Sequence, residues 1–169
     1  MNAEDLRNLQ APLKAQYRET PESARVPARA EAQVMPDRPS ALVNGAKTEQ
    51  QAGLHPAAGG DGSEACSADM LLEALVACAG VTLKAVATAM NVELRSARVA
   101  AEGWWDARGT LGLDRSVPVG LTEVSLVFHL DSPAEAKTLL KLVELTERFC
   151  VIYQTLKAGV PVSTTLEAA

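Results

Sequence analysis

The sequence has few of the residues by which nucleic-acid-binding proteins are recognised. Only two Trp, two Tyr and two Phe occur in 169 residues, and no two of the 16 lysines and arginines are adjacent. The formal net charge is −5. Nucleic-acid-binding proteins usually carry a basic stripe, and those that stack single strands add aromatic side chains to it. We therefore expect no nucleic-acid partner.

Long hydrophobic runs are also absent. The longest uncharged apolar run is Ala74–Leu83, about half the length that a membrane-spanning helix needs. The chain opens with Met1-Asn2-Ala3-Glu4-Asp5, which does not have the basic and then apolar pattern of a signal peptide. We expect no membrane partner and a cytoplasmic location.

Cysteine and histidine are too scarce for a disulfide framework or an obvious metal site. The three cysteines, Cys66, Cys78 and Cys150, form no C-x-x-C pair, and the cytosol keeps thiols reduced. No ligand pair among these cysteines, His55 and His129 has the spacing typical of zinc sites. We expect no metal and no other cofactor, which leaves thiol chemistry or plain buried cysteines.

Prolines and glycines are concentrated in the first third of the chain. Six of the nine prolines and five of the eleven glycines precede Cys66. This composition disfavours long helices and favours short strands joined by turns. We predict a glycine-rich loop over residues 55–62. Before it, we predict a hairpin turn at Thr20–Ser23 and strands at Leu13–Arg18, Arg25–Val34 and Ala41–Asn44.

From Ser67 onward the pattern becomes that of a long helix. Ser67 suits the N-cap position, and Asp69 places a negative charge in the first turn, where the helix dipole favours it. Asn91 is suited to a left-handed end. Two adjacent stripes are apolar: Leu71, Leu75, Cys78 and Thr82, and Met70, Ala74, Ala77, Val81 and Ala85. A helix that is apolar over so wide an arc is buried, which suggests that a dimer covers part of it.

The second half of the chain predicts strands followed by helices. Ser132-Pro133-Ala134-Glu135 has the pattern of a capping box with proline at the first helical position. A second helix is expected from Cys150 to Gly159. The predicted strands are Val92–Ala107, Leu121–Leu130 and a closing strand at Val160–Leu166. Runs of strands and helices, rather than strict alternation, indicate an α+β fold.

We therefore predict one domain over residues 1–169. Its parts are an N-terminal region of strands and loops (1–66), a central helix (67–91) and a strand–helix–strand region (92–169).

The roles of the cysteines stay open on residues alone. Cys78 lies in the middle of a helix beside leucines, which is typical of a small buried hydrophobic residue. Cys150 lies at a junction where it can cap the next helix, and a helix N-terminus lowers the pKa of a thiol. This reasoning favours Cys150 as the more reactive cysteine.

Five further residues receive structural interpretations. Cys66, at the junction of loop and helix, is interpreted as a packing residue, His55 as a solvated loop residue, and His129 as a surface residue. For His55 the alternative is a place in a pocket at a dimer interface. Trp104 and Trp105 are expected to point to opposite faces of a strand.

Two motifs around the cysteines resemble a known family. Cys66-Ser67-Ala68-Asp69-Met70-Leu71-Leu72-Glu73-Ala74-Leu75-Val76-Ala77-Cys78 is similar to the central helix of the OsmC/Ohr family, the osmotically inducible and organic hydroperoxide resistance proteins. In that family a helix of the form P-E-x-L-x-A-x-x-x-x-C follows a glycine-rich loop. The stretch from Cys150 to Val162 resembles the family's second cysteine motif. The resemblance extends from about Gly59 to the C-terminus.

The resemblance implies a thiol peroxidase on an OsmC-like α+β fold. It implies that Cys78 attacks an organic hydroperoxide as a thiolate and becomes a sulfenic acid, which Cys150 resolves as a disulfide. A dithiol such as dihydrolipoamide then reduces the disulfide. A nearby thiol captures the sulfenic acid before further oxidation. The family also forms intertwined homodimers with sites at the interface.

The sequence departs from the family at two positions. In the hydroperoxide-resistance branch, an arginine from an N-terminal loop pairs with the reactive cysteine and a glutamate orients it. Ala68 occupies the glutamate position with Asp69 beside it, and Arg18 and Arg25 are both candidates for the arginine. Val151 replaces the usual proline. Two alternatives to the peroxidase therefore remain open: a binding protein for a small apolar ligand, and a redox sensor.

Overall fold

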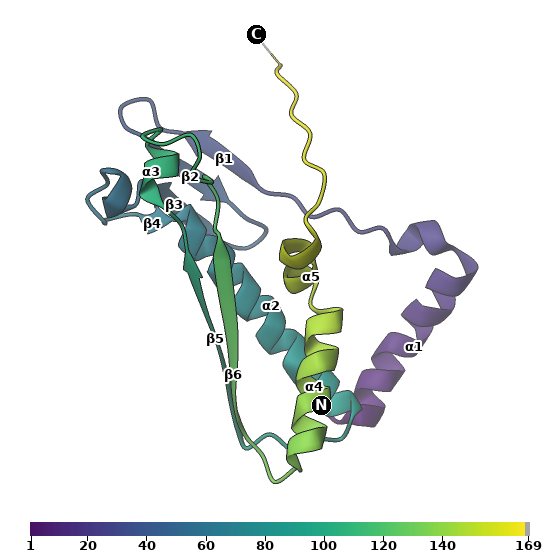
Figure 1. Ribbon diagram of the computed structural model, residues 1–169. Coiled ribbons are helices and arrows are strands. Elements are labelled where there is room, and N and C mark those ends of the chain that lie inside the picture. The colour runs from purple at the N-terminus through teal and green to yellow at the C-terminus, as the bar shows by residue number, and fades with distance from the viewer. Residues whose placement is uncertain (168–169) are drawn as a thin grey trace.

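A 23-residue helix, α2 (Ser67–Ala89), runs through the centre of the protein, and the other elements are arranged around it (Figure 1). The computed structural model describes residues 1–167. The mixture of strands and helices confirms the predicted α+β class and the long central helix. Cys66, not Ser67, is the N-cap of α2, and its side chain makes no capping hydrogen bond. Asn91 has a φ of 56°, so the predicted left-handed end is confirmed.

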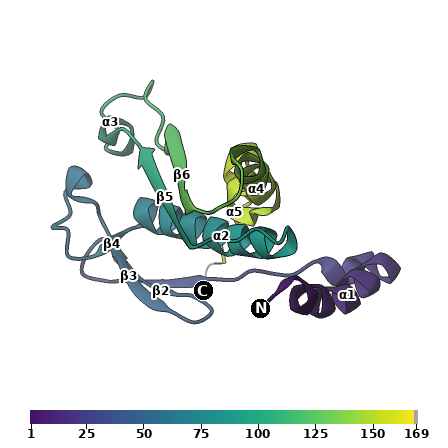
Figure 2. The same ribbon diagram turned by 90° about the horizontal axis from the view of Figure 1, so that it is seen from below.

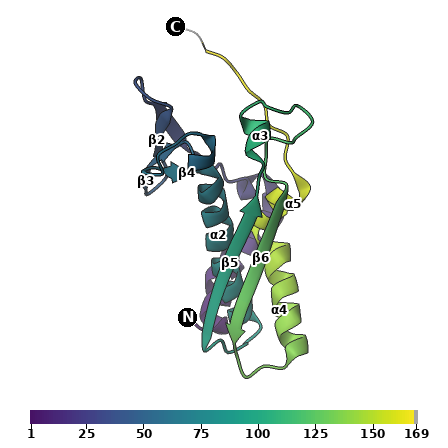
Figure 3. The ribbon, with the colours of Figure 1, turned by 60° about the vertical axis from the view of Figure 1, so that its left-hand side comes forward.

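Two long strands lie side by side along α2 (Figure 3). β5 (Ser96–Trp104) and β6 (Glu123–Asp131) pair antiparallel over their full length and confirm the two predicted strands in shortened form. The loop between them contains a short helix, α3 (Ala107–Thr110). Val99, Phe128 and Leu130 from the two strands pack against the core around α2. The β5–β6 ribbon is therefore the sheet that covers one side of the central helix.

The N-terminal region begins with a helix that the sequence analysis did not predict. α1 (Ala3–Glu19) replaces the predicted strand Leu13–Arg18. A 3-10 turn (Pro21–Ala24) replaces the predicted hairpin turn. The physical reason is a capping box: Asn2 Oδ1 accepts from the Asp5 N–H at 2.9 Å, and Asp5 Oδ2 accepts from the Asn2 N–H at 3.0 Å. This start stabilises the helix although Pro12 lies inside it.

A small sheet projects from the N-terminal end of α2, on the other side of the helix from β5 and β6 (Figure 2). It confirms the strand predicted at Ala41–Asn44, but only the end of the predicted strand Arg25–Val34 belongs to it, and β3 was missed. Its pairs are antiparallel except the last, which is parallel. The strands follow in order β1 (Glu31–Val34), β2 (Ser40–Asn44), β3 (Glu49–Gly53) and β4 (Ala65–Cys66).

Two helices follow β6 and pack against α2. α4 (Ala136–Phe149) begins with Glu135 as an N-cap that makes no side-chain capping bond, so the predicted capping box at Ser132 is wrong. Ser132 instead donates its hydroxyl to the Glu93 carbonyl, which joins two loops. α5 (Val151–Ala158) confirms the predicted second helix. The predicted closing strand Val160–Leu166 does not form, since no strand lies beside it among residues 1–167.

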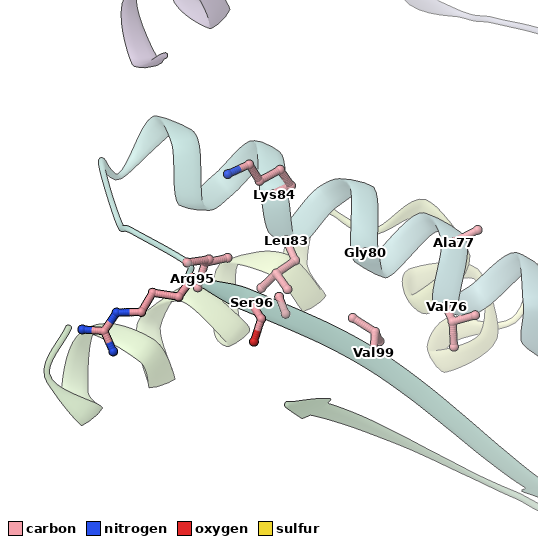
Figure 4. A pocket seen from close by; sticks show the side chains of 10 residues that line it. Val76, Ala77, Gly80, Leu83, Lys84, Arg95, Ser96 and Val99 are labelled. Atoms are coloured by element: carbon pink, nitrogen blue, oxygen red, sulfur yellow. The ribbon is translucent and has the colours of Figure 1, made fainter. Parts of the chain in front are cut away.

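One face of α2 remains uncovered within the single chain. Only four of its residues are buried, Leu75, Ala79, Leu83 and Ala87. The buried row therefore shares Leu75 with the first predicted stripe and otherwise runs beside both stripes. Val81 is 74% exposed. A hollow of about 460 Å³ separates α2 from β5 (Figure 4). By length and composition α2 could cross a membrane, but the buried central helix of a soluble protein meets the same criteria.

The core where α2 meets α4 gives a stability prediction. Leu142 is 0% exposed and packs with Leu83 and Ala87. We expect Leu142→Ala to lower the free energy of unfolding by about 2–5 kcal/mol, because it leaves a cavity in a packed core. Leu140 lies on the same helix and is 72% exposed, so Leu140→Ala should change the stability by less than about 0.5 kcal/mol. Denaturant unfolding compares the two variants, and equal losses would contradict this core.

Candidate active site

Two of the three cysteines meet where α2 packs against α5. Cys78 lies in the middle of α2 and is half-buried, while Cys150 is the N-cap of α5 and is 1% exposed. The two thiols lie close enough that each affects the pKa of the other. The fold thus brings close together the two cysteines that lie in the two sequence motifs. Cys66, the third, lies at the N-terminus of α2.

The surroundings of Cys78 favour its thiolate. Burial alone would raise the pKa of this thiol, but hydrogen bonds outweigh burial and the pKa lies below its ordinary value. The donors are the Ile152 backbone N–H, the Cys150 thiol, the Val151 backbone N–H and the Thr82 hydroxyl. Hydrogen bonds to the charged form of an acid stabilise that form. Cys78 is therefore the more readily ionised member of the pair.

The surroundings of Cys150 have the opposite effect. Burial raises the pKa of Cys150 above its ordinary value, and the adjacent Cys78 raises it further. The Tyr153 N–H donates to Cys150 Sγ at 3.5 Å and only partly offsets these effects. The sequence-based ranking of Cys150 as the more reactive cysteine is wrong in this respect. Cys150 does cap α5 as predicted, but its burial outweighs the benefit of that position.

The charged partners considered for Cys78 lie elsewhere in the chain. Arg18 is in the last turn of α1 and Arg25 follows the 3-10 turn, and both are exposed. The five strongest influences on the pKa of Cys78 include no charged side chain. Ala68 and Asp69 lie in the first turn of α2, and Asp69 is exposed. The lowered pKa of Cys78 is thus due to neutral groups of the same chain.

A cavity of about 580 Å³, lined by both apolar and charged side chains, lies close to the thiol pair, between α2, β6 and α5. Leu75 lines it one helical turn before Cys78, and Tyr153 lines it one turn after Cys150. Burial raises the pKa of Tyr153, and the neighbouring Glu147, which also lines the cavity, adds to that effect. Further apolar lining comes from Leu71, Leu121, Val124, Leu126 and Leu156. The sequence analysis gave no role to Tyr153, although it lies in the second cysteine motif, or to Glu147, which lies outside both motifs.

A second cavity of about 410 Å³ contains the remaining candidates. His55, Cys66 and Trp105 all line it. The His55 ring meets the Trp105 ring edge-on, with centroids 5.4 Å apart, so His55 is a half-buried pocket residue rather than a solvated one. Trp104 is 46% exposed and is the last residue of β5, so the prediction that both tryptophans lie on one strand is only half right: Trp105 follows the strand. Among residues 1–167, no three His, Cys, Asp or Glu side chains gather closely enough to hold a metal ion.

The sequence from residue 60 to residue 165 matches the family described as OsmC-like protein. The chain belongs to this family. The match begins where the resemblance to the OsmC/Ohr motifs began and includes both Cys78 and Cys150. No curated protein has a significantly similar sequence.

Solved structures of other OsmC-like proteins share the fold. The OsmC-like protein of Mycoplasma pneumoniae superposes with a TM-score of 0.66 at 18% identity, covering 79% of this chain and 89% of that chain. The organic hydroperoxide resistance protein OsmC of Legionella pneumophila gives 0.62 at 15% identity, with 80% and 92% covered. OhrB of Bacillus subtilis, an organic hydroperoxide resistance protein, gives 0.55 at 16%, with 79% and 93% covered. The OsmC-like fold is thus confirmed.

Proposed function

We propose that the protein reduces organic hydroperoxides, with Cys78 as the attacking residue and Cys150 as the resolving residue. The observation that carries this proposal is that Cys78 in α2 and Cys150 at the N-cap of α5 meet where these two helices pack together. The pKa of Cys78 is lowered and that of Cys150 is raised, which agrees with these roles. A thiolate is the nucleophilic form of cysteine, whereas a resolving thiol must stay unreactive until it is needed. Membership of the OsmC-like family supports the same function.

The chemistry of the pair has two steps. The Cys78 thiolate attacks the distal oxygen of the hydroperoxide, the O–O bond breaks, and the alkoxide leaves as an alcohol after taking a proton. Cys78 is then a sulfenic acid. The Cys150 sulfur next attacks the Cys78 sulfur, a disulfide forms, and hydroxide leaves with the Cys150 proton as water. Two thiols and one hydroperoxide thus become one disulfide, one alcohol and one water.

The reducing half of the cycle needs an external dithiol. We propose a small dithiol of the dihydrolipoamide type as the reductant, acting in the cytoplasm. It attacks the Cys78–Cys150 disulfide, passes through a mixed disulfide and leaves as its own cyclic disulfide. No metal or further cofactor takes part in this scheme.

The apolar lining of the nearby cavity favours an organic hydroperoxide over hydrogen peroxide. Leucine side chains from α2, α5, β6 and the residues just before β6 form the apolar part of its lining, which also includes Glu123, Glu147 and Lys157. Burial of the substrate's hydrocarbon part there gains about 25 cal/mol per Å² of apolar surface removed from water. Hydrogen peroxide has no such surface. The substrate preference therefore follows from the cavity rather than from the thiols.

We also propose a homodimer in which the uncovered face of α2 is buried. This face carries Ala74, Ala77 and Val81, all exposed in the single chain. Gly80 has open space where a side chain would stand, and Figure 4 shows Ala77 and Gly80 on α2 opposite Val99 on β5. A second copy of the chain would remove this apolar surface from water, which is the usual fate of such a helix face.

A binding protein for a small apolar ligand is the second candidate. The observation in its favour is that neither Cys78 nor Cys150 lines the 580 Å³ cavity. In that case a small apolar ligand occupies the cavity, and neither thiol is oxidised.

Hydroperoxide consumption separates the two candidates. We expect the protein with dihydrolipoamide to consume cumene hydroperoxide with a higher kcat/KM than hydrogen peroxide. Without protein, the same mixture gives the background rate. Consumption at that background rate, together with saturable binding of an apolar fluorescent probe, would overturn the peroxidase and favour the binding protein.

A further inference from the structure

Two leucine side chains belong to both of the cavities described above. Leu71 and Leu121 line the first cavity, of about 580 Å³, and also the second cavity, of about 410 Å³. The first cavity is otherwise lined by residues such as Tyr153, and the second by His55 and Trp105. Because the two cavities share two lining residues, they adjoin at Leu71 and Leu121.

The two cavities follow one another along α2. Leu75 lines the first cavity and Ser67 lines the second, and Leu71 lies midway between them on the helix. Residues four apart on a helix are neighbours on its surface, so these three positions form one row. The row spans about 12 Å along the helix axis. It leads from the neighbourhood of the thiol pair to the N-terminal end of α2.

Leu121 is the more firmly held of the two shared side chains. The N–H and the hydroxyl of Thr122 both donate to the Trp104 carbonyl, at 2.8 and 3.2 Å, which ties this segment to the end of β5. A Cβ atom on Gly103 would lie only 3.2 Å from Leu121 Cδ2, so this leucine packs directly against β5. Leu71 is 39% exposed and has fewer contacts to hold it.

The wall of the second cavity is also fixed by hydrogen bonds. The Ala57 N–H donates to His55 Nδ1 at 3.0 Å, and the N–H groups of Ala58 and Gly60 donate to the His55 carbonyl at 2.8 and 3.1 Å. The His55 ring also meets the Trp105 ring. Ligand cavities are usually formed in advance in this way.

The two cavities differ in charge. Glu123, Glu147 and Lys157 line the first. In the part of the chain that the structure describes, no Asp, Glu, Lys or Arg side chain lines the second, and most of its lining is apolar. The second cavity therefore suits an uncharged hydrocarbon group, whereas the first also accepts polar groups.

We propose that the two cavities form one binding groove, in which the second cavity receives the far end of an elongated hydrocarbon ligand after it passes Leu71 and Leu121. The inference deepens the proposed peroxidase function and rests on it for the identity of the ligand as an organic hydroperoxide. The reactive end then lies in the first cavity, near the thiols. Leu71 and Leu121 are thus specificity-determining residues, because they control whether a hydrocarbon chain extends into the second cavity.

The test measures the binding of hexanol and decanol, two unreactive analogues of the alcohol product, by titration calorimetry. Each methylene group removed from water should tighten binding about two- to fourfold, so decanol should bind the wild type at least about tenfold more tightly than hexanol. Ala58 lines only the second cavity of the two. We expect Ala58→Phe, which fills that cavity, to lower this affinity ratio at least about fivefold.

Two further variants complete the test. Leu71→Trp narrows the passage between the cavities and should also lower the ratio, so it tests the proposal independently should Ala58→Phe fail to fold. Ala57 is adjacent to Ala58, is exposed and does not line the second cavity. Ala57→Phe is therefore the matched control and should keep the wild-type ratio.

Two results would overturn the inference. One is a wild-type ratio in both Ala58→Phe and Leu71→Trp, which would show that the chain of decanol stays within the first cavity. The other is equal weakening of hexanol and decanol by Ala58→Phe, which would show that the second cavity is a separate site. Because alcohol binding involves no thiol chemistry, either failure is distinguishable from failure of the peroxidase proposal, which shows only in hydroperoxide consumption.

Discussion

Cys78→Ser is expected to lower the rate of reaction with cumene hydroperoxide by at least about a thousandfold, since removing a nucleophile removes the covalent step. A serine hydroxyl at this position has neutral donors around it and no base to ionise it. Intact mass after hydroperoxide treatment should show no added oxygen on this residue and no disulfide at Cys150. Stopped-flow measurement of hydroperoxide loss gives the rate.

The Cys150→Ser variant is expected to fail at a later step of the reaction than the Cys78→Ser variant. The first attack still occurs, because Cys78 keeps the backbone and hydroxyl donors around it. No thiol is then present to resolve the sulfenic acid, so Cys78 should gain one oxygen and then a second as hydroperoxide is added. Cys66→Ser serves as the control and should behave as the wild type. Cys66 is the N-cap of α2 and lies about three helical turns before Cys78. Identical behaviour of all three variants would contradict the assigned roles.

Val81→Glu is expected to convert the proposed homodimer to monomer. Val81 is 74% exposed in the single chain, on the face of α2 that a second copy would cover. A carboxylate on each chain would be buried without a partner in the dimer, at a cost of several kcal/mol. Each 1.4 kcal/mol weakens association tenfold, so dissociation should be complete at micromolar protein. Light scattering coupled to size exclusion measures the mass.

The control for Val81→Glu is the same kind of substitution at an equally exposed apolar residue. Leu113 lies in the loop between β5 and β6 and is also 74% exposed. Leu113→Glu should leave the mass of the assembly unchanged. If both variants keep the mass of the wild type, α2 does not form the interface between copies.

The central helix and the C-terminal half of the fold could be predicted because their signals are local. The stretch from Ser67 to Ala89 has no proline and is apolar over a wide arc, and the strand at Glu123–Asp131 alternates. Such periodic patterns are the strongest guide to secondary structure. The missed helix α1 also had a local signal, the Asn2–Asp5 capping box. Pro12 and the nearby prolines masked it, since proline usually ends a helix.

Which of the two thiols has the lower pKa could not be predicted in the same way. It depends on which sulfur the first N–H groups of α5 face, and that is fixed by the packing of α5 against α2. From the sequence, the N-terminal position of Cys150 indicated the lower pKa. In the structure Cys150 is buried, which raises its pKa, while the pKa of Cys78 lies below its ordinary value. The pairing itself was implied by resemblance, since no spacing rule links residues so far apart in the chain.

The sequence also predicted more strand than the single chain contains. Val160–Leu166 has a composition suited to a strand, but Val162 is 88% and Leu166 is 90% exposed. A strand needs a neighbouring edge for its backbone hydrogen bonds, and none lies next to this segment among residues 1–167. The prediction therefore fails for a reason outside the segment itself.

The most direct test of the central claim is a single-turnover reaction of the fully reduced wild-type protein with one equivalent of cumene hydroperoxide. We measure the alcohol released and map the cysteine peptides under non-reducing conditions. The account predicts one alcohol per disulfide, a crosslink between Cys78 and Cys150, and a free thiol at Cys66. Persistence of all three thiols in the presence of excess hydroperoxide, or a crosslink through Cys66, would contradict it.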